Sequence, residues 1–463
     1  MYKLIIIFVL ISSFSFGQEG ISYASVDSAS YADFMKADYK SIRKIGRNAK
    51  IAKIDFFYLR MRLGIVAYDK KKYEYAIKHF EKAFEMNPGD IITQEYLYYT
   101  YFFSGRLDQA QVLAESLSES FQKKVGLKTK KLESLAIGFQ DFSNTNIEDN
   151  ASRNFLDPSF KRGDAVLNGK TFGFNITLEN RLNARTHLYN KLSIFQTYSM
   201  GVEQFTSSPG MAATSTTQAI PPTSASLKEV DYKNKQFQYN FGLSRLTKRN
   251  LSLSFGLGFY RTNTSDLLVQ PSQPQQGIPY NPLGSLVYKE GKTVFNNVSL
   301  SLNIGKRLRY ISPSIGLSFS NLYNTNQFQA EGGIVYYPFG NTHFYGKTSF
   351  AYISNNDIDQ NVFTQKIGFK ITKYVWLDGI YSVGNHSNYI SDIGFSIYNT
   401  ADPVLSNLNV NLHFYVKKTE FIFGYSLQTR QAQFNQFSSS TVYSIAKYQY
   451  TNNNFLTTIK WNF

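Results

Sequence analysis

Beyond residue 131 the chain alternates bulky apolar residues with small uncharged ones, and this two-residue period constrains its fold more than any other feature. In stretches 237–244 and 251–259, Phe, Tyr and Leu alternate with Ser, Asn, Gln and Gly. Successive side chains of a β-strand point to opposite faces of a sheet, so one face here is apolar and the other polar. The same period recurs at 172–178, 298–304, 315–319 and 410–414. The pattern predicts a long antiparallel sheet.

The polar face of this sheet is small and uncharged, whereas a soluble sandwich would normally expose many Lys and Glu. Charged residues are only 18% of the chain and aromatic residues 16%. After the first 20 residues no apolar run reaches the length of about 18 residues expected of a membrane helix. A sheet in lipid must close on itself, because an open edge leaves amides unpaired in hydrocarbon. We therefore expect residues 131–463 to form a transmembrane antiparallel β-barrel in a Gram-negative outer membrane, with lipid around it.

Segment lengths predict the strand number. Short turns are expected at 180–185, 246–250, 305–309, 338–341, 372–374 and 417–419. Longer polar segments lie at 145–166, 206–229, 262–290, 321–326, 354–360, 385–404 and 431–440. Outer-membrane barrels have short periplasmic turns and longer outer loops, which gives about 14 strands, with 12 or 16 as alternatives. Parity requires a first strand at 132–143, and residues 388–398 are assigned to an outer loop. The long loops 206–229 and 262–290 are candidates for a plug, for ligand contact, or for plain surface loops.

The last residues place Phe455, Thr457, Ile459, Trp461 and Phe463 on one face of a strand. This segment is similar to the closing strand of bacterial outer-membrane proteins. In those proteins the terminal Phe is part of the signal read by the barrel-assembly machinery. The resemblance implies that Trp461 and Phe463 contact this machinery during biogenesis.

The first residues have the features of an export signal. Lys3 gives a positive start, residues 4–14 are apolar, and residues 15–17 end in Gly after Ser-Phe. An apolar stretch of this length is too short to cross a bilayer as a helix. We expect residues 1–17 to be a signal peptide.

Between the signal and the sheet, residues 18–130 have helical spacing. Small residues, an aromatic residue and a helix-ending proline follow in order: Gly64, Ala76, Phe80, Ala83 and Pro88. This order resembles a tetratricopeptide repeat, whose period is about 34 residues. A looser copy follows at 97–110. The resemblance implies a periplasmic array of paired antiparallel helices.

Tetratricopeptide arrays bind peptides or proteins on their concave face. The candidates here for contact with a periplasmic protein partner are Tyr58, Arg62, Tyr98 and Tyr101. The alternative is that the two or three repeats only brace the barrel.

Motifs for catalysis, metals or cofactors are missing from the sequence. There is no Cys, and the five His have no metal-ligand spacing. No His-Glu-x-x-His, Walker or Gly-x-Ser-x-Gly motif is found, so we predict no catalytic, metal or cofactor residues and no enzyme. The formal net charge of +16 is spread along the chain without a basic–aromatic motif, and we predict no nucleic-acid partner.

The order of signal, short helical array and barrel resembles the YaiO-type outer-membrane family and, more distantly, the surface-lipoprotein assembly modulators. The latter implies a role in secretion or surface-protein export. Composition rich in Tyr and Asn also resembles exported barrels of Bacteroidetes. The preferred hypothesis is that the repeats recruit a protein client for outer-membrane assembly or secretion. The alternatives are a channel for small solutes or polysaccharide export, and a lipid-modifying barrel enzyme, which lacks a recognisable triad.

Overall fold

The computed structural model describes residues 21–127, 131–153, 155–160, 162–205, 231–247, 249–271, 286–355, 359–398, 402–438 and 443–463. The predicted signal peptide 1–17 and the loop 206–229 lie outside these residues. Internal contacts divide the chain near Leu127 into a helical unit and a barrel unit. Each unit is described by itself.

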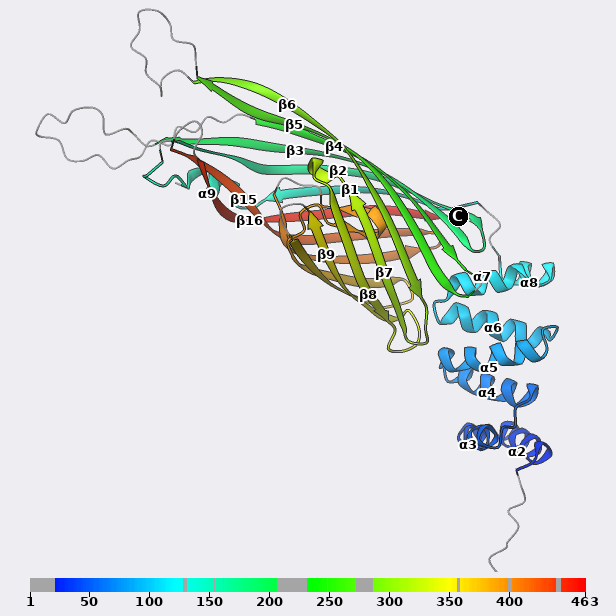
Figure 1. Cartoon of the computed structure of the whole chain (residues 1–463). Helices are drawn as coiled ribbons and strands as arrows, with labels where there is room; N and C mark the ends of the chain where they lie inside the picture. Colours follow the sequence, from blue (N-terminus) through cyan, green and yellow to red (C-terminus); the bar gives the residue numbers. More distant parts are fainter. Residues whose placement is uncertain are drawn as a thin grey trace, which may run out of the picture. The chain divides into compact units, whose positions relative to one another are not determined.

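The helical unit is a series of short helices that pack in antiparallel pairs (Figure 1). Its helices are α2 (Tyr23–Met35), α3 (Tyr39–Ile51), α4 (Phe57–Asp69), α5 (Tyr73–Met86), α6 (Ile91–Phe103), α7 (Leu107–Glu115) and α8 (Glu119–Lys124). Asp38, Asp90 and Ser118 begin α3, α6 and α8 by accepting a hydrogen bond from a first-turn amide. None of the described helices combines the length and apolarity needed to cross a bilayer.

The seam between α4 and α5 depends on a glycine. A Cβ on Gly64 would lie 2.5 Å from the ring of Phe80, so only glycine lets the two helices approach this closely. Phe80, Ala76 and Ala83 are fully buried, and Pro88 follows directly after α5 and its C-cap Asn87. Burial among other tyrosines raises the pKa of Tyr68 to about 12 in the same core. These residues pack as the spacing predicts.

The barrel unit is a closed antiparallel sheet of fourteen strands within the described residues. The strands are β1 (Leu132–Asn144), β2 (Arg162–Asn183), β3 (Thr186–Phe205), β4 (Asp231–Leu246), β5 (Leu251–Pro271), β6 (Leu286–Lys306), β7 (Ile311–Ser320), β8 (Gln327–Tyr336), β9 (Phe344–Asn355), β10 (Asp359–Lys370), β11 (Val375–Gly384), β14 (Val404–Val416), β15 (Thr419–Phe437) and β16 (Tyr443–Asn462). Each strand pairs with its neighbour in sequence, and β16 pairs with β1 to close the barrel. The predicted fold class, fourteen strands and first strand are confirmed.

The six short turns lie where the sequence predicts them, but several of the long loops are shorter than expected, two of them markedly. Strand β5 continues to Pro271 and β6 begins at Leu286, so much of 262–290 is strand. Strand β15 likewise continues to Phe437, into the predicted loop 431–440. The sequence did not predict these extensions because they lack the regular alternation of apolar and polar residues. The strands can still pair there, since pairing uses main-chain hydrogen bonds and requires no apolar face.

The outside of the barrel is apolar and the inside is polar. Phe139, Ile315 and Phe455 on the outer face are 58%, 69% and 60% exposed. Ser299 and Asn240 on the inner face are almost fully buried. An apolar belt around a closed sheet suits lipid outside and a polar lumen inside. The chain has the architecture of an outer-membrane β-barrel.

Candidate functional site

The lumen is occupied by the segment between β11 and β14, of which the structure describes residues 385–398, 402 and 403. This inserted loop carries a two-residue hairpin of β12 (Ile390–Ser391) and β13 (Ser396–Ile397) with the 3₁₀ turn η2 (Asp392–Gly394) between them. At its base, His386 is fully buried, with Nδ1 2.8 Å from the carbonyl of Val404 and Nε2 2.9 Å from Ser382 Oγ. The base of the loop is thereby fixed to the two strands that carry it.

The tip of the inserted loop reaches the far wall of the barrel. Five strands separate β11 from β5 in the barrel order, yet η2 packs on β4, β5 and β6. A Cβ on Gly256 would lie 1.9 Å from the carbonyl oxygen of Ile393, and one on Gly242 would lie 2.6 Å from the ring of Phe395. These two glycines form a niche for the tip. The loop therefore crosses the whole lumen.

Neutral side chains of the wall hold the middle of the loop. Gln329 Nε2 donates to the carbonyl of Ile390 at 2.7 Å, and its Oε1 accepts from the Ile390 amide at 3.0 Å. Gln327 donates to the carbonyl of Asn388 at 2.7 Å. An apolar patch on the inner wall packs against Tyr389 and Tyr398 of the loop, and it consists of Ala351, Ile353 and Val362. The glutamine side chains satisfy main-chain groups of the loop, which would be costly to bury without a hydrogen bond. The apolar patch packs against the rings of the two tyrosines.

The tip adopts a backbone that its residues disfavour. Asp392 and Ile393 have φ of 49° and 54°, in the left-handed region. A β-branched residue there is strained, at a cost of order 1–3 kcal/mol. These two residues form the turn between β12 and β13, where the chain reverses direction.

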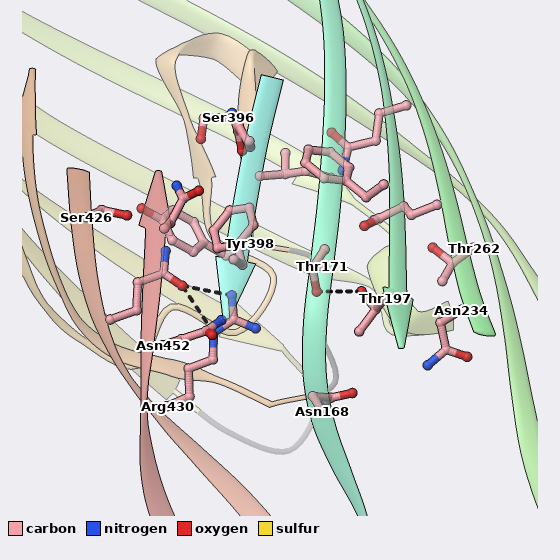
Figure 2. Close-up of a pocket in the computed structure, with 18 of the residues that line it drawn as sticks. Asn168, Thr171, Thr197, Asn234, Thr262, Ser396, Tyr398, Ser426, Arg430 and Asn452 are labelled. Atoms are coloured by element: carbon pink, nitrogen blue, oxygen red, sulfur yellow. Dashed lines mark hydrogen bonds between the residues drawn. The ribbon is translucent and has the colours of Figure 1, made fainter. Parts of the chain in front are cut away.

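A cavity of about 290 Å³ lies beside the inserted loop. Figure 2 shows Tyr398 and Ser396 of the loop between Ser426, Arg430 and Asn452 on one side and Thr171, Thr197, Asn234 and Thr262 on the other. Asn, Gln, Ser and Thr make up most of the lining, and no Asp or Glu is among the described residues that line it. The cavity suits a polar solute.

Two cationic side chains face this cavity. The Lys191 ammonium donates to the carbonyl of Phe395 in the inserted loop at 2.8 Å. The Arg430 guanidinium donates to Gln428 Oε1 at 3.1 and 2.8 Å. Lys235 also borders the cavity. Residues directly opposite each other on paired strands point to the same face of the sheet, and Lys235 is opposite Gln196, which is opposite Phe172 on the outer face. Its side chain therefore points away from the lumen.

At the short-turn end, the lumen contains a layer of charged side chains. His413 is 2.7 Å from Asp378 Oδ2 through Nε2 and 2.8 Å from Glu420 Oε1 through Nδ1. Because carboxylate oxygens accept, both ring nitrogens must donate, and the ring is cationic. Elsewhere in the layer, Lys460 pairs with Glu179 at 2.9 Å, and Glu133 binds both Arg181 and His187. The ion pairs connect adjacent strands, as in Asp378–His413–Glu420, or strands separated by one other, as in Lys460–Glu179.

The predicted partner-binding residues separate into two groups. Tyr58 is exposed, and the Arg62 guanidinium lies over its ring and that of Tyr31 while donating to Asp27 at 2.7 Å. Tyr98 and Tyr101 are buried in the helical core, which corrects their assignment to an accessible face. Their helical period fits the core side of α6 as well as it fits a binding face.

The structure brings one serine and one histidine together, but not in an arrangement that would activate the serine as a nucleophile. Ser382 and His386 form a Ser–His contact, but both are buried and His386 Nδ1 faces carbonyl oxygens instead of a carboxylate. No cluster of metal-binding side chains is found in the part of the chain that the structure describes.

Trp461 lies in β16 opposite Leu135 of β1, at the closure of the barrel.

Sequence reasoning placed 388–398 in a loop but missed that this loop fills the lumen. It also took the lumen positions as mostly neutral, which the charged layer corrects. Strand parity could have found that layer, since Glu179 and Arg181 share the inward face of β2 with Asn175 and Thr177. No local signal marks the inserted loop, because its partners are wall residues distant in sequence.

No protein-family model matches this chain. No curated protein matches it either. Among solved structures, a FadL homologue of Pseudomonas aeruginosa is similar at 10% identity and a TM-score of 0.43, covering 73% of this chain and 91% of that one. The toluene transporter TodX of Pseudomonas putida is similar at 8% identity and 0.42, with 73% and 91% covered. The toluene transporter TbuX of Ralstonia pickettii is similar at 10% identity and 0.43, with the same coverage. Scores below 0.5 carry no inference about what this lumen holds.

Proposed function

We propose that this chain is a non-enzymatic outer-membrane channel for small polar solutes, closed by residues 385–398 of the inserted loop. This favours the channel over the assembly role that the sequence first suggested. The observation that carries the proposal is that the loop crosses a polar lumen and leaves a polar cavity beside it. A solute taking this path would meet the loop.

The contacts of the loop support a removable closure. The described part of the loop is held mainly by main-chain carbonyls, amide side chains and Lys191. Its contacts with the charged wall pair Glu331 and Lys347 are long: the Tyr389 hydroxyl donates to Glu331 at 3.3 Å, and Lys347 lies 3.9 Å from the largely exposed Asp392. The wall strands remain paired to each other without the loop.

Planar-bilayer conductance of the full chain tests the proposal. Replacing residues 388–398 by a short Gly-Ser linker should raise the steady conductance at least about tenfold, because it removes the occupant of the lumen. Linker replacement of residues 439–442, between β15 and β16, is the control for a change of loop. A trimmed barrel that folds but stays silent would contradict the channel function.

For the helical unit we propose binding of a periplasmic protein, which keeps the recruitment hypothesis as a second candidate. The supporting observation is the exposed pair Tyr31 and Tyr58, held around Arg62. Aromatic residues and Arg are enriched where proteins bind each other tightly. A photo-cross-linking residue at position 58 of the full chain should capture one defined protein in cells, whereas the same residue at exposed Ile51 should not. Equal capture from both positions would contradict this role.

Outer-membrane location, export by residues 1–17 and assembly through Trp461 and Phe463 belong to the same proposal. The apolar outer belt and the closing strand β16 support them.

A further inference from the structure

We propose that the lumen cavity binds a small hydroxyl-rich anion with the size and chemistry of a sugar acid. This inference rests on the proposed channel function and names the class of solute for its site. It is argued from the charge of the lining, from the amide and hydroxyl side chains of the lining, and from the volume of the cavity.

The charge of the lining favours an anion. Lys191 and Arg430 contribute positive charge, and among the described residues no carboxylate lies within ion-pair distance of the Lys191 ammonium. Asp402 is close to the Arg430 side, but it accepts hydrogen bonds at 2.7 Å from Asn168 and from Tyr450. Both cations donate to neutral oxygens, the Phe395 carbonyl for Lys191 and Gln428 for Arg430. The carboxylate that acts on Lys191 is Asp392, which is beyond ion-pair distance and largely exposed, so an anion in the cavity can still interact favourably with Lys191.

The neutral polar lining favours a ligand with hydroxyl groups. Most side chains that line the cavity are amides or hydroxyls, such as Thr171, Thr197, Asn234, Ser426 and Asn452. Amide and hydroxyl oxygens accept hydrogen bonds, and the hydroxyl groups of a sugar donate them. The lining thus offers acceptors for hydroxyls together with cations for an acid group.

The volume sets the size of the solute. At about 290 Å³ the cavity is at the lower end of the range for ligand sites, roughly 300–1,000 Å³. It fits a monosaccharide-sized molecule and not a polysaccharide segment.

The same ammonium serves the inserted loop and the proposed ligand. Lys191 donates to Phe395, whose ring sits against the Gly242 niche. The ammonium has three N–H donors, so an anion bound at Lys191 shares the same cation with the Phe395 carbonyl. Binding is thereby coupled to one of the contacts that hold the loop tip.

Isothermal titration calorimetry on the full chain in detergent tests the site with D-glucuronate and D-glucose, which differ in one carboxylate. Glucuronate should bind at least about tenfold more tightly than glucose, as expected for a charge-assisted hydrogen bond. Lys191→Met should remove most of this preference. Lys235→Met is the matched control, because its side chain borders the same region from the outer face and should leave binding unchanged.

Several outcomes would overturn the proposal. They are absence of heat for both sugars, equal affinity for both, or an equal loss in Lys191→Met and Lys235→Met. If Lys191→Met fails to fold, Arg430→Gln supplies the second variant and should also lower the preference. Calorimetry measures binding independently of conduction. A protein that binds glucuronate but does not conduct would contradict the channel function alone, and one that conducts but does not bind glucuronate would contradict the ligand proposal alone.

Discussion

The lumen is filled in two different ways at two levels. At the short-turn end, side-chain ion pairs such as Asp378–His413–Glu420 connect neighbouring strands of the wall. Above them, the inserted loop fills the space with main-chain carbonyls, amides and a few apolar side chains. The first filling is part of the wall, and the second is a separate segment laid against it. The difference suggests that the charged layer stabilises the barrel and the loop controls passage.

Breaking the charged layer should have the largest effect. Replacing His413 with Leu leaves Asp378 and Glu420 buried without their shared cation, which should lower the free energy of unfolding by about 3–5 kcal/mol. Urea unfolding in lipid vesicles measures the change. His413→Gln keeps a hydrogen-bond donor and should lose less, and conductance should stay at the wild-type level in both. A rise in conductance instead would show that this layer also gates the lumen.

Blocking the niche of the loop tip should have an intermediate effect. In Gly256→Val the new Cβ would meet the Ile393 carbonyl, so the tip must leave its place on β5. We expect the open fraction to rise about tenfold, or about 1.4 kcal/mol in the gating equilibrium, with the barrel still folded. Single-channel recording measures it. Gly332→Val is the control, since nothing lies within 4 Å of a Cβ there, and similar recordings from the two variants would refute a docked tip.

Removing the exposed charge of the tip should have the smallest effect. Asp392 is 69% exposed at its side chain and 3.9 Å from Lys347, a geometry that contributes about 0–0.5 kcal/mol. Asp392→Asn should therefore leave both conductance and thermal stability within error of wild type. A severalfold change in conductance would mean that charge, and not main-chain packing, anchors the loop.

The helical unit and the barrel also differ in what the sequence could predict. Gly64 and Phe80 lie on α4 and α5, the two helices of one pair, and their spacing predicted the contact that the structure shows. Tyr98 and Tyr101 were placed wrongly because a helical period identifies a face without saying what covers it. The tetratricopeptide and YaiO-type resemblances remain predictions.

Strand alternation and turn spacing determined a closed barrel with an apolar outside and favoured about 14 strands over 12 or 16, because both are properties of short stretches of chain and of the lipid that must surround them. The occupant of the lumen was decided by tertiary structure alone. Lys191 meets Phe395 across 204 positions of sequence, and Gln329 meets Ile390 across 61. Such contacts arise when closure brings opposite walls together, and no local period encodes which loop then fits between them.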